Sequence, residues 1–268
     1  MTWPNSRQWP IVVALLLIEI LLGVGIVFAQ EKEPLKGIAM AVYNLSDLKS
    51  LNADVFYTWG FCQEAQCIPM VRSAQVPPIC PEILLVGNEP NAIEPYGSPS
   101  TPKEFAEKVV RIEKQCPNTK QVAGNVSVDD WKSLGGTGKG RLWLYLFLKE
   151  YKRITGNDYV DALGVHCYTQ HLAQYCIEEL AQIKRVWGGE LWITEWGVVS
   201  GDVSQFIAFM NYVGKNFDAG FVYTNRQPHT GLGWELPGGT ELMSGEDPTD
   251  IGIVFRDTVY NSSRVNYE

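Results

Sequence analysis

The sequence predicts a single-domain (β/α)8 barrel, the TIM-barrel fold, and three observations lead to this prediction. Eight short runs with strand character follow one another along the chain. Most of these runs are nearly continuous stretches of apolar residues, as expected of parallel strands covered on both faces. Segments with helical spacing of apolar residues separate several of them. The alternative is an open doubly wound sheet, but its dinucleotide-binding form needs a glycine-rich fingerprint after the first strand, and none is present.

The candidate strands combine β-branched, aromatic and aliphatic residues and end at polar or turn-forming residues. Their ranges are 37–44, 54–60, 67–73, 82–89, 121–128, 161–168, 191–198 and 220–226. The connections between the first four strands are short, and Pro77-Pro78 marks one of them as a loop. We therefore expect reduced helices in the first half of the barrel.

Four helices are predicted in and around the second half, where apolar residues recur at spacings of three and four. They are expected over 101–115, 140–156, 171–189 and 202–217. Thr101 is the expected N-cap of the first helix, with Pro102 at its first helical position. Gly156 is the expected C-terminal stop of the second helix.

Residues 1–29 precede the fold and carry a long apolar run, "IVVALLLIEILLGVGIVFA". Small residues before Gln30 favour a cleaved export signal. The alternative is an uncleaved N-terminal membrane anchor, which Glu19 in the middle of the run disfavours because a carboxylate in hydrocarbon is costly. In both cases residues 30–268 are expected to form the (β/α)8 domain in an extracytoplasmic space, secreted or held at the membrane by the anchor.

Composition limits the partners. The net charge of -8 argues against nucleic acid as a partner, because its binding rests on neutralisation of phosphates by clustered Lys and Arg. The charge is compatible with a neutral substrate, and we expect a monomer with no nucleic-acid partner and no cofactor. Membrane contact is expected only if the N-terminal segment stays uncleaved.

Six cysteines in an exported chain indicate disulfides. Pairing near neighbours joins Cys62 to Cys67 and Cys167 to Cys176, which leaves Cys80 with Cys116. The alternative is a metal site made of His166, Cys167 and Cys176. No CxxC pair or histidine-rich cluster supports that alternative, so we predict no metal.

Polar residues and aromatics gather where the predicted strands end. In barrels of this kind the active site lies at the carboxyl ends of the strands. The candidates on or beside those ends are the carboxylates Glu89 and Glu195 and, as substrate contacts, Trp59, Asn88, Asn125, His166, Tyr168 and Trp196. His166 and Tyr168 are two residues apart in one strand and therefore point to the same side.

Glu89 and Glu195 form the chemically informative pair. One protonated and one ionised carboxyl group can cleave a glycosidic bond: the first donates to the leaving oxygen and the second attacks the anomeric carbon. A separation near ~5 Å gives retention of configuration, and a wider gap that admits water gives inversion. Sequence alone leaves both outcomes open.

The motifs "VGNEPN", "GVHCY" and "WITEWG" occur in this order on the expected strands. With them the chain resembles clan A glycoside hydrolases. More narrowly, it resembles the glycosyl hydrolase catalytic-core family, which includes fungal alkali-sensitive linkage protein and small endo-β-1,3-glucanases. The resemblance covers roughly residues 37–260.

The resemblance implies a retaining O-glycoside hydrolase (EC 3.2.1.-) with endo action on an extracellular polysaccharide, β-1,3-glucan in the narrower family. It implies Glu89 as acid/base and Glu195 as nucleophile. It also implies that Asn88 binds the sugar 2-hydroxyl, and that Tyr168 or His166 orients the nucleophile. As the acid, Glu89 is expected to have a raised pKa.

The chain departs from the family pattern at two places. Cys167 lies between His166 and Tyr168, where the family often has an aromatic residue. The eighth strand, "FVYTNR", lacks the Trp that commonly forms the floor of the sugar site, and Tyr223 or Trp234 is the expected substitute.

A second class of function fits the same fold. A carbohydrate-binding protein could keep the barrel without catalysis. The presence of both Glu89 and Glu195 favours the enzyme, because a binding protein does not need an acid and a nucleophile.

Overall fold

The computed structural model describes most of the chain after its leader. The described residues are 33–92, 97–128, 140–226 and 240–260. The barrel belongs to the unit Glu33–Glu268. The predicted leader at 1–29 and the predicted sugar-site residue Trp234 lie outside the described residues. Within those residues no helix is both long and apolar enough to cross a membrane.

Eight parallel strands form one sheet whose order around the ring follows the chain, β2-β1-β8-β7-β6-β5-β4-β3. Their bounds are β1 Leu35–Ala39, β2 Val55–Tyr57, β3 Met70–Val71, β4 Ile83–Val86, β5 Lys120–Ser127, β6 Ala162–Thr169, β7 Glu190–Val198 and β8 Ala219–Tyr223. Strand β1 pairs with both β2 and β8, so the sheet curls back on itself. Between β2 and β3 the ladder is reduced to a bridge between Phe56 and Cys67 and a 2.9 Å bond from Met70 N to Gly60 O. The result is a nearly closed barrel, which confirms the (β/α)8 prediction; the open doubly wound alternative is wrong.

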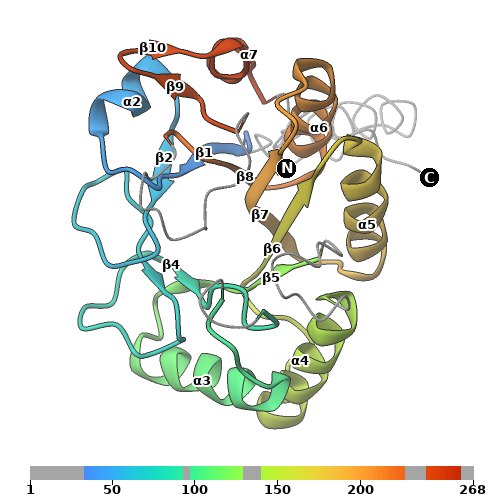
Figure 1. Cartoon of the computed structure of the whole chain (residues 1–268). Helices are drawn as coiled ribbons and strands as arrows, with labels where there is room; N and C mark the ends of the chain where they lie inside the picture. The colour runs from blue at the N-terminus through green and yellow to red at the C-terminus, as the bar shows by residue number, and fades with distance from the viewer. Residues whose placement is uncertain (1–32, 93–96, 129–139, 227–239, 261–268) are drawn as a thin grey trace, which may run out of the picture. The chain divides into compact units, whose positions relative to one another are not determined.

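Helices cover the outside of the strands, and Figure 1 shows the long ones beside the second half of the barrel. They are α2 Leu45–Ser50, α3 Pro102–Gln115, α4 Gly140–Thr155, α5 Ala173–Val186, α6 Val203–Asn216 and α7 Asp250–Asp257. A small antiparallel hairpin pairs β9 Met243–Ser244 with β10 Asp247–Pro248. The predicted reduction in the first half is confirmed: α2 has six residues, and the connections at 58–69 and 72–82 contain no helix. Thr101 caps α3 as predicted, with Pro102 in its first turn, and Gly156 follows α4 at φ 80°.

Alternation along the strands sorts the apolar residues into two layers. In β8, Phe221 points into the barrel beside Trp192 of β7, and their rings are stacked with centroids 6.0 Å apart. The next residue, Val222, belongs to the outer core between strands and helices. Because the barrel interior is filled with side chains, it is a packed core, and polar chemistry is confined to its rim.

Three disulfides agree with the predicted pairing: Cys62–Cys67, Cys80–Cys116 and Cys167–Cys176. The last pair lies between β6 and α5 and is completely buried. A metal binds cysteine as the thiolate. The alternative metal site at His166 therefore loses both of its sulfur ligands.

Candidate active site

Two buried carboxylates lie at the carboxyl ends of β4 and β7. Glu89 follows β4 and Glu195 is in β7, and each residue is only 5% exposed. His166 of β6 lies between them, with Nδ1 3.1 Å from Glu89 Oε1 and 3.5 Å from Glu195 Oε2. One oxygen of each carboxylate and a ring nitrogen of His166 all lie within 4.8 Å of one another. The fold therefore brings together three groups that are 29 to 106 positions apart in the sequence.

Three donors converge on Glu195. The Tyr57 hydroxyl and Trp59 Nε1 each donate to Oε1 at 2.7 Å, and the Tyr168 hydroxyl donates to Oε2 at 2.6 Å. Burial, reinforced by the Glu195 charge, raises the pKa of both Tyr57 and Tyr168 well above the ordinary value of a phenol. Both phenols consequently stay protonated and act as donors. They fix the plane of the Glu195 carboxylate, with both oxygens held.

The backbone adopts an unusual conformation at two of the candidate site residues. Glu89 and Trp59 have φ values of 42° and 53°, in the left-handed region that side-chain-bearing residues rarely adopt. Such conformations cost about 1–3 kcal/mol each and collect at sites where the geometry is needed. Here they turn the chain at the ends of β2 and β4, so that both side chains face the site.

The group of Glu89, His166 and Glu195 is also where the described residues could hold a cation. A second group, Cys62, Glu64 and Cys67, has the necessary proximity, but its two sulfurs are joined in a disulfide. The donors around Glu195 already hold the carboxylate without a metal, and the prediction made from sequence needs none.

The other predicted site residues lie at different distances from the carboxylates. Asn88 precedes Glu89 and is 4% exposed, with its backbone N–H donating to Arg72 O. Tyr223, at the end of β8, is half-buried and packs edge-on against Trp59 and Tyr168, with ring centroids 5.8 and 5.9 Å apart. Their roles toward a sugar remain predictions.

Two predicted substrate contacts are wrong. Trp196 is fully buried on the outer side of β7, where its ring lies 5.0 Å from the rings of Phe206 and Phe209 in α6. Neighbouring strand residues face opposite sides, so Trp196 points away from the site that Glu195 faces. Asn125 is also fully buried, and its amide donates to three backbone carbonyl oxygens.

Sequence reasoning missed Tyr57, whose hydroxyl contacts Glu195. The signal was present, because Tyr57 is two residues before Trp59 in the second predicted strand and residues two apart share a face. It also missed Thr194. A buried threonine inside an apolar run does not reveal which residue of another strand its hydroxyl bonds to.

We expect Tyr57→Phe to lower kcat by about 10–100-fold, because a hydrogen bond to a charged group contributes about 1.5–3 kcal/mol. The hydroxyl lies 2.7 Å from Glu195 Oε1 and 2.9 Å from Thr194 O, so the variant loses both contacts while keeping the ring. Initial rates on a soluble substrate would measure the loss. Tyr151→Phe is the matched control, since it removes a part-buried hydrogen bond from a tyrosine to a glutamate (Glu113) in the helix layer. Equal rates for the two variants would contradict the role of Tyr57.

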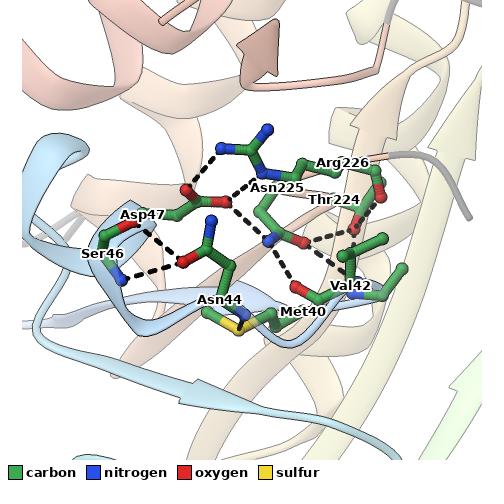
Figure 2. A network of polar contacts seen from close by, with 9 residues as sticks. Met40, Val42, Asn44, Ser46, Asp47, Thr224, Asn225 and Arg226 are labelled. Atoms are coloured by element: carbon green, nitrogen blue, oxygen red, sulfur yellow. Dashed lines mark hydrogen bonds and ion pairs between the residues drawn. The ribbon is translucent and has the colours of Figure 1, made fainter. Parts of the chain in front are cut away.

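A second polar network lies at the ends of β1 and β8, and Figure 2 shows its members. Arg226 forms two 2.8 Å bonds to the Asp47 carboxylate, whose side chain is 1% exposed. Asn225 Nδ2 donates to Asp47 Oδ2 at 2.9 Å and to Val42 O at 2.7 Å. The network therefore ties helix α2 and the preceding loop to the segment that follows Tyr223.

Fold and site together define a class: (β/α)8 proteins with a carboxylate pair at the ends of strands four and seven. The family model described as "Glycosyl hydrolase catalytic core" matches residues 41–220. The chain belongs to this family. No curated protein sequence matches the chain.

Solved structures share the fold at low sequence identity. An endo-β-1,3-glucanase of family GH128, subgroup II, from Pseudomonas viridiflava is 21% identical, with a TM-score of 0.64 over 85% of this chain and 98% of that one. A subgroup I endo-β-1,3-glucanase from Amycolatopsis mediterranei, in complex with laminaritriose, is 16% identical, with a TM-score of 0.59 over 84% and 98% of the two chains. A curdlan-specific exo-β-1,3-glucanase of subgroup III from Blastomyces gilchristii, in complex with glucose, is 17% identical, with a TM-score of 0.59 over 83% and 98%.

Proposed function

We propose that the protein is a retaining endo-β-1,3-glucanase acting outside the cytoplasm. The observation that carries the proposal is the close approach of two buried carboxylates, with one oxygen of each within 4.8 Å of the other. Retaining glycosidases have carboxyl groups about 5–5.5 Å apart, whereas inverting ones need about 6.5–9.5 Å to admit a water. This separation supports double displacement.

The environments of the two carboxylates support different roles. Glu195 receives three donors, which hold it in one orientation as a nucleophile must be held. In the first step a Glu195 oxygen attacks the anomeric carbon while Glu89 gives its proton to the leaving glycosidic oxygen. In the second step Glu89 takes a proton from water, and that water displaces Glu195 from the anomeric carbon.

His166 and Asn88 complete this proposal. His166 Nδ1 is within 3.5 Å of both carboxylates, so it can hold them in a fixed position relative to each other during proton transfer. Asn88 directly precedes Glu89 and is proposed to bind the sugar 2-hydroxyl. Trp59 and Tyr223 form a wall of aromatic rings beside Glu195 that is suited to a sugar ring.

The substrate class rests on the comparisons. The structural neighbours include endo- and exo-β-1,3-glucanases, and two of them are complexes with laminaritriose and with glucose. We propose β-1,3-glucan and endo action for this chain, with export directed by residues 1–29 as a cleaved signal. Three disulfides fit an oxidising compartment.

The test is a panel of β-1,3-glucan, β-1,4-glucan, β-1,4-mannan and β-1,4-xylan with detection of new reducing ends. It uses the full chain made in an oxidising compartment, beside Glu89→Gln and Glu195→Gln. We expect cleavage of β-1,3-glucan alone, abolished in both variants. Proton NMR of the first product should show the β-anomer, and early products should be oligosaccharides rather than glucose. A wild-type protein that cleaves none of the four but binds one of them would establish the carbohydrate-binding alternative.

A further inference from the structure

Strands β5 and β7 each contain one extra residue, and along β6 the two extra residues fall on either side of Val165. In the pairing of β5 with β6, Gly124 lies opposite Gly164 and Val126 opposite Val165, so Asn125 has no partner position. In the pairing of β6 with β7, Val165 lies opposite Ile193 and His166 opposite Glu195, so Thr194 is the extra residue. Two β-bulges therefore meet across β6. Bulges beside active sites re-aim the side chains near them.

The bulge in β7 sets the direction of Glu195. Ile193 and Trp196 both belong to the outer core, although they are three residues apart. Regular alternation would place residues three apart on opposite faces. The extra Thr194 shifts the alternation, so that Glu195 rather than its neighbour faces the site.

The two bulges are joined by a side-chain contact inside the barrel. Thr194 Oγ1 donates to Asn125 Oδ1 at 2.7 Å, and both residues are fully buried. The contact passes over Gly164 of β6, where a Cβ would lie 2.1 Å from Asn125 Oδ1. Glycine at this position is what allows the side chains of β5 and β7 to meet across the strand between them.

Asn125 also holds the strand that carries the other carboxylate. Its amide donates to Val86 O and Gly87 O of the β4 end at 3.0 and 3.1 Å. Its backbone carbonyl accepts from Glu89 N at 2.9 Å. The φ of 48° at Asn125 is what turns its carbonyl and side chain toward β4 and β7 together.

From these contacts we infer that Asn125 and Thr194 are positioning residues that set the separation of Glu89 and Glu195. The inference rests on the proposed function for its kinetic consequence. The link runs from Glu89 N to Asn125 O, through the Asn125 side chain to Thr194 Oγ1, and along one peptide unit to Glu195. Each carboxylate is therefore attached directly to this network of hydrogen bonds. No residue of the network is exposed.

The test replaces Thr194 with valine, which keeps the side-chain shape and removes the donor. We expect kcat on β-1,3-glucan oligosaccharides to fall about 10–100-fold, because a displacement near 1 Å at a catalytic group costs about 10²-fold. KM should stay within about twofold, since no sugar contact is removed. Gly164→Ala should reproduce the loss from the opposite side by displacing the Asn125 amide.

Thr169→Val is the matched control. Thr169 is a buried β6 threonine whose Oγ1 donates to Leu172 O at 2.7 Å, outside the link. It should lose a similar amount of thermal stability and keep its kcat. A kcat for Thr194→Val equal to that of Thr169→Val would overturn the inference.

Crystal structures separate this inference from the proposed function. If the wild type hydrolyses no glucan, the proposed function fails, and the link is judged from structures of the wild type and Thr194→Val. A change in the Glu89–Glu195 carboxyl separation in the variant supports the link. An unchanged separation refutes it.

Discussion

Glu195→Ala is expected to reduce hydrolysis by about 10⁴-fold or more, the size typical of removing a catalytic nucleophile. A small anion can take the place of the lost carboxylate, because the donors from Tyr57, Trp59 and Tyr168 remain around the vacated position. Three converging N–H and O–H donors in a buried site bind a small anion. We therefore expect azide to occupy the position of the carboxylate and restore turnover of an aryl β-glycoside with a good leaving group.

The configuration of the rescued product distinguishes the two carboxylates. In Glu195→Ala, azide attacks from the nucleophile's side and gives the α-glycosyl azide. In Glu89→Ala, Glu195 still forms the covalent intermediate, and azide replaces water in the second step to give the β-glycosyl azide. Proton NMR of the products would measure both. The α-azide from Glu89→Ala, or rescue in neither variant, would reverse or remove the proposed assignment.

Glu190→Ala is the matched control for these variants. Glu190 starts the same strand at the opposite end of the barrel, where its carboxylate pairs with Lys120 at 2.5 Å. Its replacement removes a carboxylate of the same strand without touching the site. Hydrolysis at the wild-type rate, unaffected by azide, is the expected result.

The sequence was most informative where burial alone decides structure. Each of the eight strands overlaps the apolar run that predicted it, because a parallel strand covered on both faces must be apolar along its length. Glu89 and Glu195 stood out as candidates because a carboxylate is conspicuous at the end of such a run. The capping of α3 by Thr101 was equally readable, since it depends on residues within one helical turn.

The errors have a common physical cause, which is that residue type does not reveal which face of a strand a side chain occupies. Trp196 was expected to contact sugar as an aromatic residue at the barrel mouth, yet it adjoins Glu195 in the strand and therefore lies on the opposite face, against α6. Asn125 was expected at the rim, but a one-residue bulge turns it into the interior. Bulges shift the period of alternation, and their signal lies in contacts between strands rather than in any one strand.

Arg226→Met is expected to lower the free energy of unfolding by about 3–5 kcal/mol, because breaking a buried ion pair leaves a buried charge uncompensated. The asymmetry of the pair sharpens the prediction: the Asp47 side chain is 1% exposed, whereas that of Arg226 is 23% exposed. Removing the arginine leaves the buried carboxylate without its counter-charge. Asp47→Asn should therefore lower the free energy of unfolding by less than Arg226→Met does. The double variant should then be more stable than Arg226→Met alone, which urea denaturation of all three would measure.

The exposed pair Arg256–Asp257 provides the control for this comparison. Its side chains are 40% and 58% exposed and are therefore screened by water, so Arg256→Met should leave the free energy of unfolding close to that of the wild type. The Asp47–Arg226 network (Figure 2) also anchors the segment after Tyr223. The Tyr223 ring packs against Trp59 and Tyr168, which both donate to Glu195. Arg226→Met should therefore raise KM as well, since the aromatic wall loses its support. A variant with wild-type stability and KM would show that the buried pair is not needed for either, and that hydration reaches Asp47 once the guanidinium is gone.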